Sequence, residues 1–341
     1  MSLLRLPFMY VAACRVVLPP RSHAVRFASD AICATAAADV VGGDGTLTIV
    51  DGHALAYRMH FALLKTKMAT EDGVPSHALH GFCTKLVELH ARNPLRRMLV
   101  AFDLPGPTFR TADLNTYKAT RPSMPDALRH QIDAMRDACA CMGVPAVSAT
   151  GFEADDVIAS CVSAASASSG ETSLVEIVAN DKDMMQLVSL PDASPRVFLW
   201  NDVKKKVVDA AAVEAQFGVQ PAQMGDLIAL MGDSSDNVPG VPGIGPKGAA
   251  KLLIEHGDLE GVLSAALDMK QSKRKQALLE HADTARQARR LVALRSDVPL
   301  ETSIACGAVP RIASDEFLDF LRRWEMHKVE RKVAALAADH S

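Results

Sequence analysis

Three short apolar runs in the first two thirds of the chain lead directly into aspartates. TLTIVD ends at Asp51, MLVAFD ends at Asp103, and LVEIVA comes just before Asp181 and Asp183. Segments of helical length separate these runs, and strands that alternate with helices form mostly parallel sheets. Parallel strands bring their carboxyl ends to one edge, where open α/β sheets bind ligands. The sequence therefore predicts an α/β fold in which these four aspartates converge at one edge.

The predicted strands all lie before about residue 210. We expect strands at 46–51, 98–103, 174–179, 197–200 and 205–209, and helices at 76–92, 126–142 and 155–165. The later part of the chain has helical spacing, with a Gly/Pro-rich interruption at 238–248. This order predicts an α/β domain over 46–210 and a helical subdomain over 211–330.

Two more acidic clusters are expected to join the same edge. GFEADDVIAS places Glu153, Asp155 and Asp156 at the start of a helix, and GDSSDNVPG places Asp233 and Asp236 three residues apart. Either cluster alone is also typical of a helix N-terminus or a turn. Nine carboxylates in one place would repel each other unless cations lie between them, and carboxylate oxygens favour Mg²⁺ or Mn²⁺. The pattern predicts a two-ion site suited to phosphoryl displacement.

The segment VPGVPGIGPKGAAKLL, residues 238–253, is predicted to hold a nucleic-acid backbone. Gly243 and Gly245 permit a tight hairpin, and the helix that follows offers free N–H groups and a positive dipole end. Lys247 and Lys251 add positive charge to one face of that helix. Such an element positions DNA without reading its sequence. A plain Gly/Pro loop is the alternative interpretation.

A second basic stretch, FRTADLNTYKATRPSMPD at 109–126, is another candidate for nucleic-acid contacts. It contains Arg110, Tyr117, Lys118 and Arg121, and cations beside an aromatic ring suit single-stranded nucleic acid. A solvated basic loop is the alternative. The formal net charge of the chain is −3, so any nucleic-acid site must be a local basic patch.

The first 29 residues differ from the rest, with four arginines and no acidic residue before Asp30. An arginine-bearing, acid-free amphiphilic start is typical of a transit peptide, whereas a secretory signal has a clean apolar core. We expect a transit peptide and flexible lead-in over 1–45 and a mitochondrial location. The apolar stretches there are too short to span a membrane. Seven scattered cysteines without a CxxC pair argue against a disulfide framework or a cysteine-based zinc site.

The chain resembles the 5′-nuclease domain of bacterial DNA polymerase I, within the flap-endonuclease superfamily. The motifs run in order from about residue 46 to about 326: IVDGHALAYRMHFAL, VAFD, YKATRP, GFEADDVIAS, ANDKDMMQLV, GDSSDNVPGVPGIGPKGAAKLL and FLRRWEM. The resemblance implies a PIN-like fold, a mostly parallel sheet flanked by helices, with a C-terminal helix–three-turn–helix subdomain. It also implies an arch near residues 104–126.

The resemblance also implies roles for the candidate residues. The implied ligands of a first Mg²⁺ are Asp51, Asp103, Glu153 and Asp155, with Asp156 close by. The implied ligands of a second Mg²⁺ are Asp181, Asp183, Asp233 and Asp236. Lys118 and Arg121 would steady the scissile phosphate, with Tyr117 beside them, and Arg58 and Arg110 would contact other phosphates. Mn²⁺ would substitute for Mg²⁺, and backbone carbonyls of the glycine hairpin would hold a K⁺.

The implied activity is that of a structure-specific 5′-3′ exonuclease and flap endonuclease. Its substrates would be branched or nicked DNA with a 5′ flap and RNA-primed DNA. Because no polymerase segment follows and the N-terminus is not of bacterial type, we expect a stand-alone monomer, without membrane association, that acts in organellar replication and repair. Pro246 and Gly248 stand where the family commonly has an acidic residue and a threonine.

Three other functions stay open on the sequence alone. A branched-DNA-binding protein without catalysis could share the fold, although none of the nine carboxylates is missing. A PIN-type nuclease for single-stranded RNA would have no use for the glycine hairpin, which serves duplex DNA. A small-molecule phosphatase with an aspartate nucleophile usually has DxD after its first strand, whereas this chain has DGH at 51–53.

Overall fold

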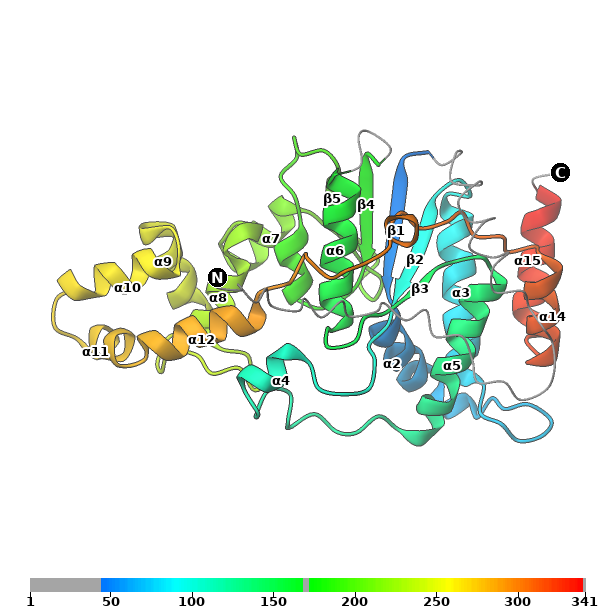
Figure 1. Ribbon diagram of the computed structural model, residues 1–341, viewed down its shortest axis with the longest axis horizontal. Coiled ribbons are helices and arrows are strands. Elements are labelled where there is room, and N and C mark those ends of the chain that lie inside the picture. The colour runs from blue at the N-terminus through cyan, green and yellow to red at the C-terminus, as the bar shows by residue number, and fades with distance from the viewer. Residues whose placement is uncertain (1–43, 168–171, 340–341) are drawn as a thin grey trace, which may run out of the picture.

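A six-stranded sheet lies at the centre of the computed structural model, which describes residues 44–167 and 172–339 (Figure 1). The strands are β1 (Thr46–Asp51), β2 (Arg97–Ala101), β3 (Ala146–Val147), β4 (Leu174–Val178), β5 (Arg196–Asn201) and β6 (Lys206–Val208). Their order is β3-β2-β1-β4-β5-β6, and only the β5–β6 pair is antiparallel. The predicted mostly parallel sheet is confirmed. The sequence reading missed β3 because two residues form no recognisable apolar run.

Alternating side chains of the strands pack into two separate cores. Leu47 and Ile49 of β1 pack with α6 (Ala154–Ala167) on one face of the sheet, whereas Val50 belongs to the core on the other face. That second core includes α2 (Gly52–Leu63), α3 (His77–Arg92) and α5 (Asp126–Cys141). Since both faces are covered, the strands are apolar almost throughout, as expected of a parallel sheet.

A group of helices extends from one end of the sheet, on the left in Figure 1. Its members are α7 (Ala210–Phe217), α8 (Met224–Met231), α9 (Pro246–His256), α10 (Leu259–Asp268), α11 (Lys273–Glu280) and α12 (Ala282–Val292). Their apolar side chains continue the core that contains α6. We call this group the helical subdomain.

The helical subdomain was predicted to extend to residue 330. In the structure it ends with α12, and the chain then returns to the α/β domain. It passes α13 (Thr302–Ala305), and the N–H of Met98 in β2 donates to the Ala308 carbonyl at 2.7 Å. The last two helices, α14 (Asp315–Arg323) and α15 (His327–Asp339), pack against α5 and α3 at the opposite end of the molecule (Figure 1). The cause is the apolar face of α14, where Phe317 and Phe320 are buried in the core around α3 and α5.

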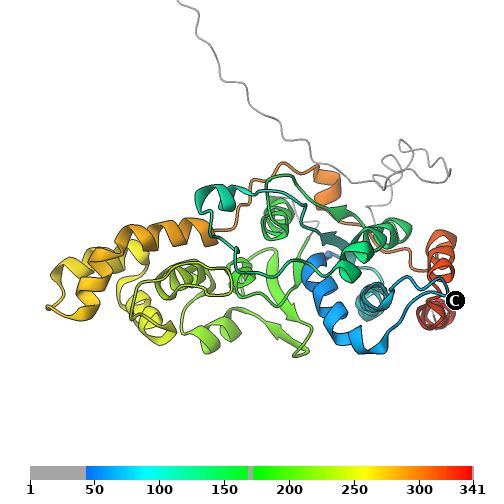
Figure 2. The same ribbon diagram turned by 90° about the horizontal axis from the view of Figure 1, so that it is seen from below.

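The predicted arch contains one short helix, α4 (Phe109–Asp113), followed by turns over 115–120 and a segment without regular structure up to α5. Figure 2 looks toward the carboxyl ends of the strands and shows this segment crossing in front of them. In the described part of the chain, no helix combines the length and apolar character needed to cross a membrane. Except for Asp44 and Gly45, the predicted transit peptide lies outside the described residues.

Candidate active site

The backbone at the ends of β1 and β2 fixes the first two carboxylates. Asp51 is the last residue of β1, and its carboxylate caps α2 by accepting the N–H of Ala54 at 2.9 Å. Gly52 is required there, since a Cβ would lie 2.8 Å from the Ala101 carbonyl oxygen of the neighbouring strand. Asp103, just after β2, accepts the N–H of Ala154 at 2.8 Å. These contacts bring β1, β2 and the start of α6 together.

Asp51, Asp103, Asp155 and Asp181 form the first carboxylate cluster, at the predicted edge of the sheet. Burial, together with the charges of Asp103 and Asp181, raises the pKa of Asp51 to about 7. The pKa of Asp155 is raised well above its ordinary value by burial and by Asp51. Such mutual repulsion shows that carboxylates from β1, β2, α6 and the end of β4 converge, as predicted. Because the negative charges of this cluster repel each other, the arrangement favours either protonation of a carboxylate or a bound cation.

Asp183, Asp233 and Asp236 form a second carboxylate cluster. Each offers a ligand oxygen, and the three oxygens lie within 4.8 Å of one another. Among the described residues, Asp183 Oδ1 is buried without a hydrogen-bond partner. Burial and then the charge of Asp181 raise the pKa of Asp183 to about 7. A hard divalent cation would satisfy the orphaned oxygen and remove this repulsion, so the donor set fits Mg²⁺ or Mn²⁺.

Asp181, a member of the first cluster, also acts on the second cluster. Its charge raises the pKa of Asp51 and Asp155 on one side and that of Asp183 on the other. Its Oδ1 also accepts the backbone N–H of Asp183 at 3.1 Å. Asp181 therefore links the two carboxylate clusters electrostatically.

Two basic residues of the arch reach the carboxylates. Lys118 Nζ lies 2.9 Å from Glu153 Oε2 and 3.9 Å from Asp236 Oδ2, and Arg121 pairs with Asp236. The backbone of Lys118 is left-handed, with φ of 54°, and its N–H donates to the Asp236 carbonyl at 2.9 Å. Asn237 Nδ2 donates to the Thr116 carbonyl and fastens the same stretch of arch. The predicted placement of Lys118 and Arg121 beside the carboxylates agrees with this geometry.

The sequence reading missed Lys182 and His53, which also touch the site. Lys182 Nζ donates to Asp233 Oδ2 at 2.6 Å. Its position in the sequence between the candidate ligands Asp181 and Asp183 could have indicated this role. His53 Nδ1 accepts the backbone N–H of Asp103 at 3.0 Å. Burial lowers the pKa of His53, so the ring is neutral at pH 7 and serves to orient the residue after β2.

Several predicted contacts require correction because their side chains have protein partners. Asp156 and Arg110 are 0% and 2% exposed and form an ion pair, so neither faces an ion or a phosphate. Tyr117 is also buried, with its hydroxyl donating to Glu153, and cannot stack on a base. Arg58 pairs with Asp202 at 2.8 Å, and its predicted phosphate contact stays a prediction.

The glycine hairpin has the expected local geometry. Gly243 has φ of +79°, a conformation that side chains rarely adopt, and Gly245 precedes α9 with Pro246 at the first helical position. Lys247 and Lys251 on the first turns of α9 are exposed. The N-terminus of α9 therefore presents open N–H groups and two cations to solvent.

The repulsion around Asp183 predicts a pH-dependent effect of Asp183→Asn on stability. Its pKa is 3.8 in ordinary surroundings and about 7 here, so the folded protein keeps a proton that the unfolded chain loses. This contribution to stability is present below about pH 4 and is lost as pH rises through about 7. In metal-free buffer, Asp183→Asn should raise the thermal unfolding midpoint near pH 8 clearly more than near pH 5, where part of the wild-type contribution remains. A shift of equal size at both pH values would contradict the account, and added Mg²⁺ should reverse the gain.

Comparison with known proteins assigns both parts of the chain. Residues 46–218 match the model of the 5′-3′ exonuclease, N-terminal resolvase-like domain, and residues 219–313 match that of the 5′-3′ exonuclease, C-terminal SAM fold. DNA polymerase I of Rhizobium leguminosarum is 39% identical over 295 residues, which cover 84% of this chain and 28% of the polymerase. The 5′-3′ exonuclease of Aquifex aeolicus is 37% identical over 218 residues, which cover 64% of this chain and 72% of that relative. The chain thus spans less than a third of the length of the polymerase.

Solved structures share the fold. The 5′-exonuclease of bacteriophage T5 with bound zinc ions has a TM-score of 0.60 at 21% identity, covering 86% of this chain and 99% of that one. The catalytic core of Rad2 in complex with a DNA substrate has a TM-score of 0.55 at 16% identity, covering 87% and 93%. The fold is therefore the PIN-like 5′-nuclease fold with a C-terminal helical part. With both family models matched in order and the carboxylates converging at the sheet edge, this chain belongs to the 5′-3′ exonuclease family.

Proposed function

We propose that this protein is a metal-dependent nuclease that cuts DNA near the junction with a 5′ single strand. The observation that carries this proposal is the pair of carboxylate clusters, joined through Asp181, beneath an arch that brings Lys118 to their edge. Two divalent ions, when bound, would supply an activated water and charge for the attacking and leaving oxygens. Asp51, Asp103 and Asp155 would hold one ion, and Asp183, Asp233 and Asp236 the other.

The residues of the chain have separable tasks in this reaction. Lys118 would place its ammonium group beside the reacting phosphate, where negative charge would increase in the pentacoordinate transition state. Its backbone is held by Asp236, so the cation is positioned before the substrate arrives. Neutral His53 and the N–H of Ala154 keep Asp103 in place. Catalysis of this kind depends on positioning and electrostatics.

The proposed substrate is branched DNA with a free 5′ strand, either a DNA flap or an RNA primer. The glycine hairpin would hold the duplex backbone at α9, and the arch would direct the single strand over the carboxylates. The catalytic core of Rad2 with DNA substrate has the same fold, which supports this choice. The finer assignments belong to the same proposal: Mg²⁺ with Mn²⁺ as substitute, K⁺ at the hairpin, a monomer, and primer and flap removal in mitochondria. The acid-free, arginine-bearing N-terminus supports the location.

A panel of labelled oligonucleotides tests this function. The full chain would be incubated with a 5′-flap duplex, an RNA-primed duplex, a nicked duplex and a free single strand, each with Mg²⁺, Mn²⁺ or EDTA. We expect metal-dependent cutting near the junction of the branched substrates, leaving a 5′-phosphate and a 3′-hydroxyl. Tight flap binding without cutting under any metal would leave a junction-binding protein. Cutting of the free single strand alone would favour an RNA-type nuclease.

Replacing Lys247 and Lys251 with alanine should weaken DNA binding without changing the chemical step. Both lysines are exposed beside the open N-terminus of α9, so each is expected to neutralise one phosphate. The slope of log K against log salt should become shallower by about two, and KM should rise while kcat stays constant. Lys328→Ala is the matched control, since Lys328 is exposed on α15 at the other end of the molecule. An unchanged salt slope in the double variant would exclude the hairpin as a phosphate contact.

A further inference from the structure

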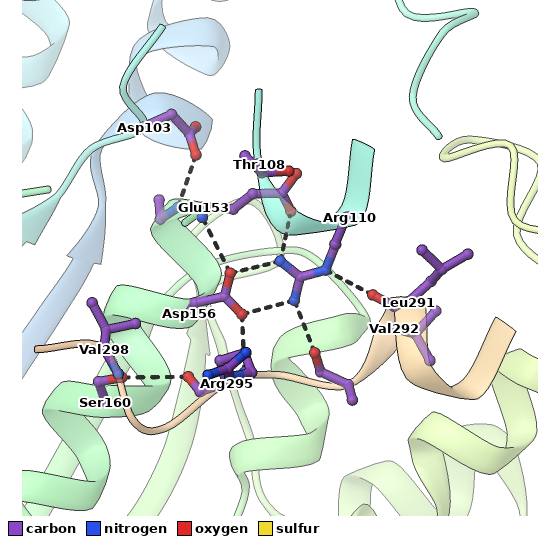
Figure 3. A network of polar contacts seen from close by, with 12 residues as sticks. Asp103, Thr108, Arg110, Glu153, Asp156, Ser160, Leu291, Val292, Arg295 and Val298 are labelled. Atoms are coloured by element: carbon purple, nitrogen blue, oxygen red, sulfur yellow. Dashed lines mark hydrogen bonds and ion pairs between the residues drawn. The ribbon is translucent and has the colours of Figure 1, made fainter. Parts of the chain in front are cut away.

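Arg110 of α4 uses every N–H of its guanidinium in a buried network (Figure 3). Nε donates to the Leu291 carbonyl at 2.7 Å, and Nη2 donates to the Ala293 carbonyl at 2.8 Å. Nη2 and Nη1 donate to Asp156 Oδ1 and Oδ2 at 2.7 and 2.6 Å, and Nη1 reaches Glu153 Oε2 at 3.3 Å. These contacts satisfy all five donors of the side chain. Arg110 therefore has no donor left for a DNA phosphate.

Asp156 is equally saturated. Its Oδ1 accepts from Arg110 and from the backbone N–H of Arg295 at 2.9 Å, and its Oδ2 accepts from Arg110 and from the backbone N–H of Glu153 at 3.1 Å. An ionised carboxylate accepts about four hydrogen bonds, so no lone pair remains for a metal ion. Although Asp156 is adjacent to Asp155 in sequence, its carboxylate has an internal role.

The network continues into the active site through the first turn of α6. Glu153, held by Asp156, accepts from Lys118 Nζ at 2.9 Å and from the hydroxyl of Tyr117 at 3.2 Å. The next residue, Ala154, donates its N–H to Asp103. A displacement of this turn would move the lysine and two carboxylates together.

We propose that Arg110 and Asp156 are positioning residues that lock the first turn of α6 between the arch and the end of α12. The pair joins three separate parts of the chain: α4 in the arch, the catalytic turn at Glu153, and the 291–295 segment where the helical subdomain ends. It thereby sets Glu153, Asp103 and Lys118 in their working arrangement, while touching neither DNA nor ion. Only the kinetic test of this inference rests on the proposed nuclease function.

Ser160 provides a control variant that should lower the stability of the protein without displacing the active-site residues. It lies one turn further along α6, where its hydroxyl donates to the Arg295 carbonyl at 3.3 Å and accepts the N–H of Val298 at 3.1 Å. It thus ties the same segment to α6 without contact to an active-site carboxylate. Ser160→Ala should lower the thermal midpoint and leave kcat unchanged. Removing one partner of a buried ion pair also destabilises the folded protein. The comparison with Ser160→Ala therefore separates an effect of lost stability from an effect of lost positioning.

The experiment compares Arg110→Lys, Arg110→Met/Asp156→Asn, Asp155→Asn and Ser160→Ala. The pair variant removes one positive and one negative charge, so it leaves the net charge near the site unchanged. Because the turn also carries Asp155 and holds Asp103, we expect it to bind Mn²⁺ somewhat more weakly than wild type but far more tightly than Asp155→Asn, with kcat lower by about 100-fold at constant KM. Arg110→Lys should recover part of kcat. In the pair variant, hydrogen exchange should show loss of protection at the N–H groups of Glu153 and Ala154, which Ser160→Ala retains.

Three results would overturn the proposal. The first is loss of Mn²⁺ affinity in the pair variant to the level of Asp155→Asn, which would make Asp156 a ligand. The second is a rise in KM at constant kcat in Arg110→Lys, which would make Arg110 a DNA contact. The third is a fall in kcat that Ser160→Ala reproduces. If the pair variant does not fold, Arg110→Lys carries the kinetic and exchange tests. If the wild-type protein cuts no flap, the proposed function fails, and Mn²⁺ binding and hydrogen exchange still decide the inference.

Discussion

Asp155→Asn should lower kcat for flap cleavage by about 1,000-fold or more, which corresponds to about 4 kcal/mol of transition-state stabilisation. Asp155 lies within the repulsive field of three other carboxylates, where its pKa is raised well above the ordinary value. Such a group is held ionised by a bound cation, and an amide would be a weaker ligand of a hard ion. The variant should bind flap DNA at least as well as wild type, because one negative charge near the phosphate is gone.

Single-turnover cleavage and DNA binding in Ca²⁺ would separate these two effects. Asp192→Asn is the matched control, since this aspartate is exposed in a loop outside the site. We expect wild-type kinetics from the control. Retention of most of the cleavage rate in Asp155→Asn would mean that the first carboxylate cluster holds no catalytic ion.

Lys118→Met should lower kcat by about 100- to 1,000-fold, as expected for loss of a preorganised cation beside a reacting phosphate. Lys118 contacts both Glu153 and Asp236, and its backbone is fixed in a left-handed conformation. Methionine keeps most of the chain length and removes the charge. KM should change much less than kcat, because the charge is required most in the transition state.

Arg121→Met is the comparison for Lys118. Its side chain is nearly half exposed, and its one ion pair among the described residues is with Asp236, so we expect a smaller effect, divided between kcat and KM. A Lys118→Met enzyme with raised KM and intact kcat would show that this lysine only binds DNA. Steady-state kinetics over a range of flap concentrations would distinguish the two outcomes.

The sequence was sufficient for the sheet and for the convergence of its aspartates. The strand ending at Asp51 and the residues following β2 and β4 were predicted from apolar runs, because parallel strands have one common carboxyl edge. The strand β3 was not predicted, because its two residues show no sequence pattern of their own and are recognised as a strand only by their backbone pairing with β2. The return of α14 to the α/β domain was also not predicted, because an amphipathic helix does not reveal which surface it covers.

The roles of residues adjacent in sequence were harder to predict than the fold. Asp155 and Asp156 are adjacent in sequence, but successive residues of a helix point about 100° apart. One therefore faces the carboxylate cluster and the other faces Arg110. A basic residue near a tyrosine also suggests nucleic-acid binding whether it is exposed or buried. Only tertiary contacts show that Arg110 and Tyr117 point inward while Lys118 and Arg121 reach the site.

The most direct test of the central claim is cleavage of a 5′-labelled flap duplex by wild type and Asp181→Asn, in Mg²⁺ and in EDTA. The charge of Asp181 acts on both clusters, so its loss should affect both proposed ion sites at once. The account predicts Mg²⁺-dependent cutting near the junction by wild type, none in EDTA, and almost none by the variant despite normal flap binding. Equal cutting by both proteins, or cutting that persists in EDTA, would contradict a catalytic role for the carboxylates at this edge.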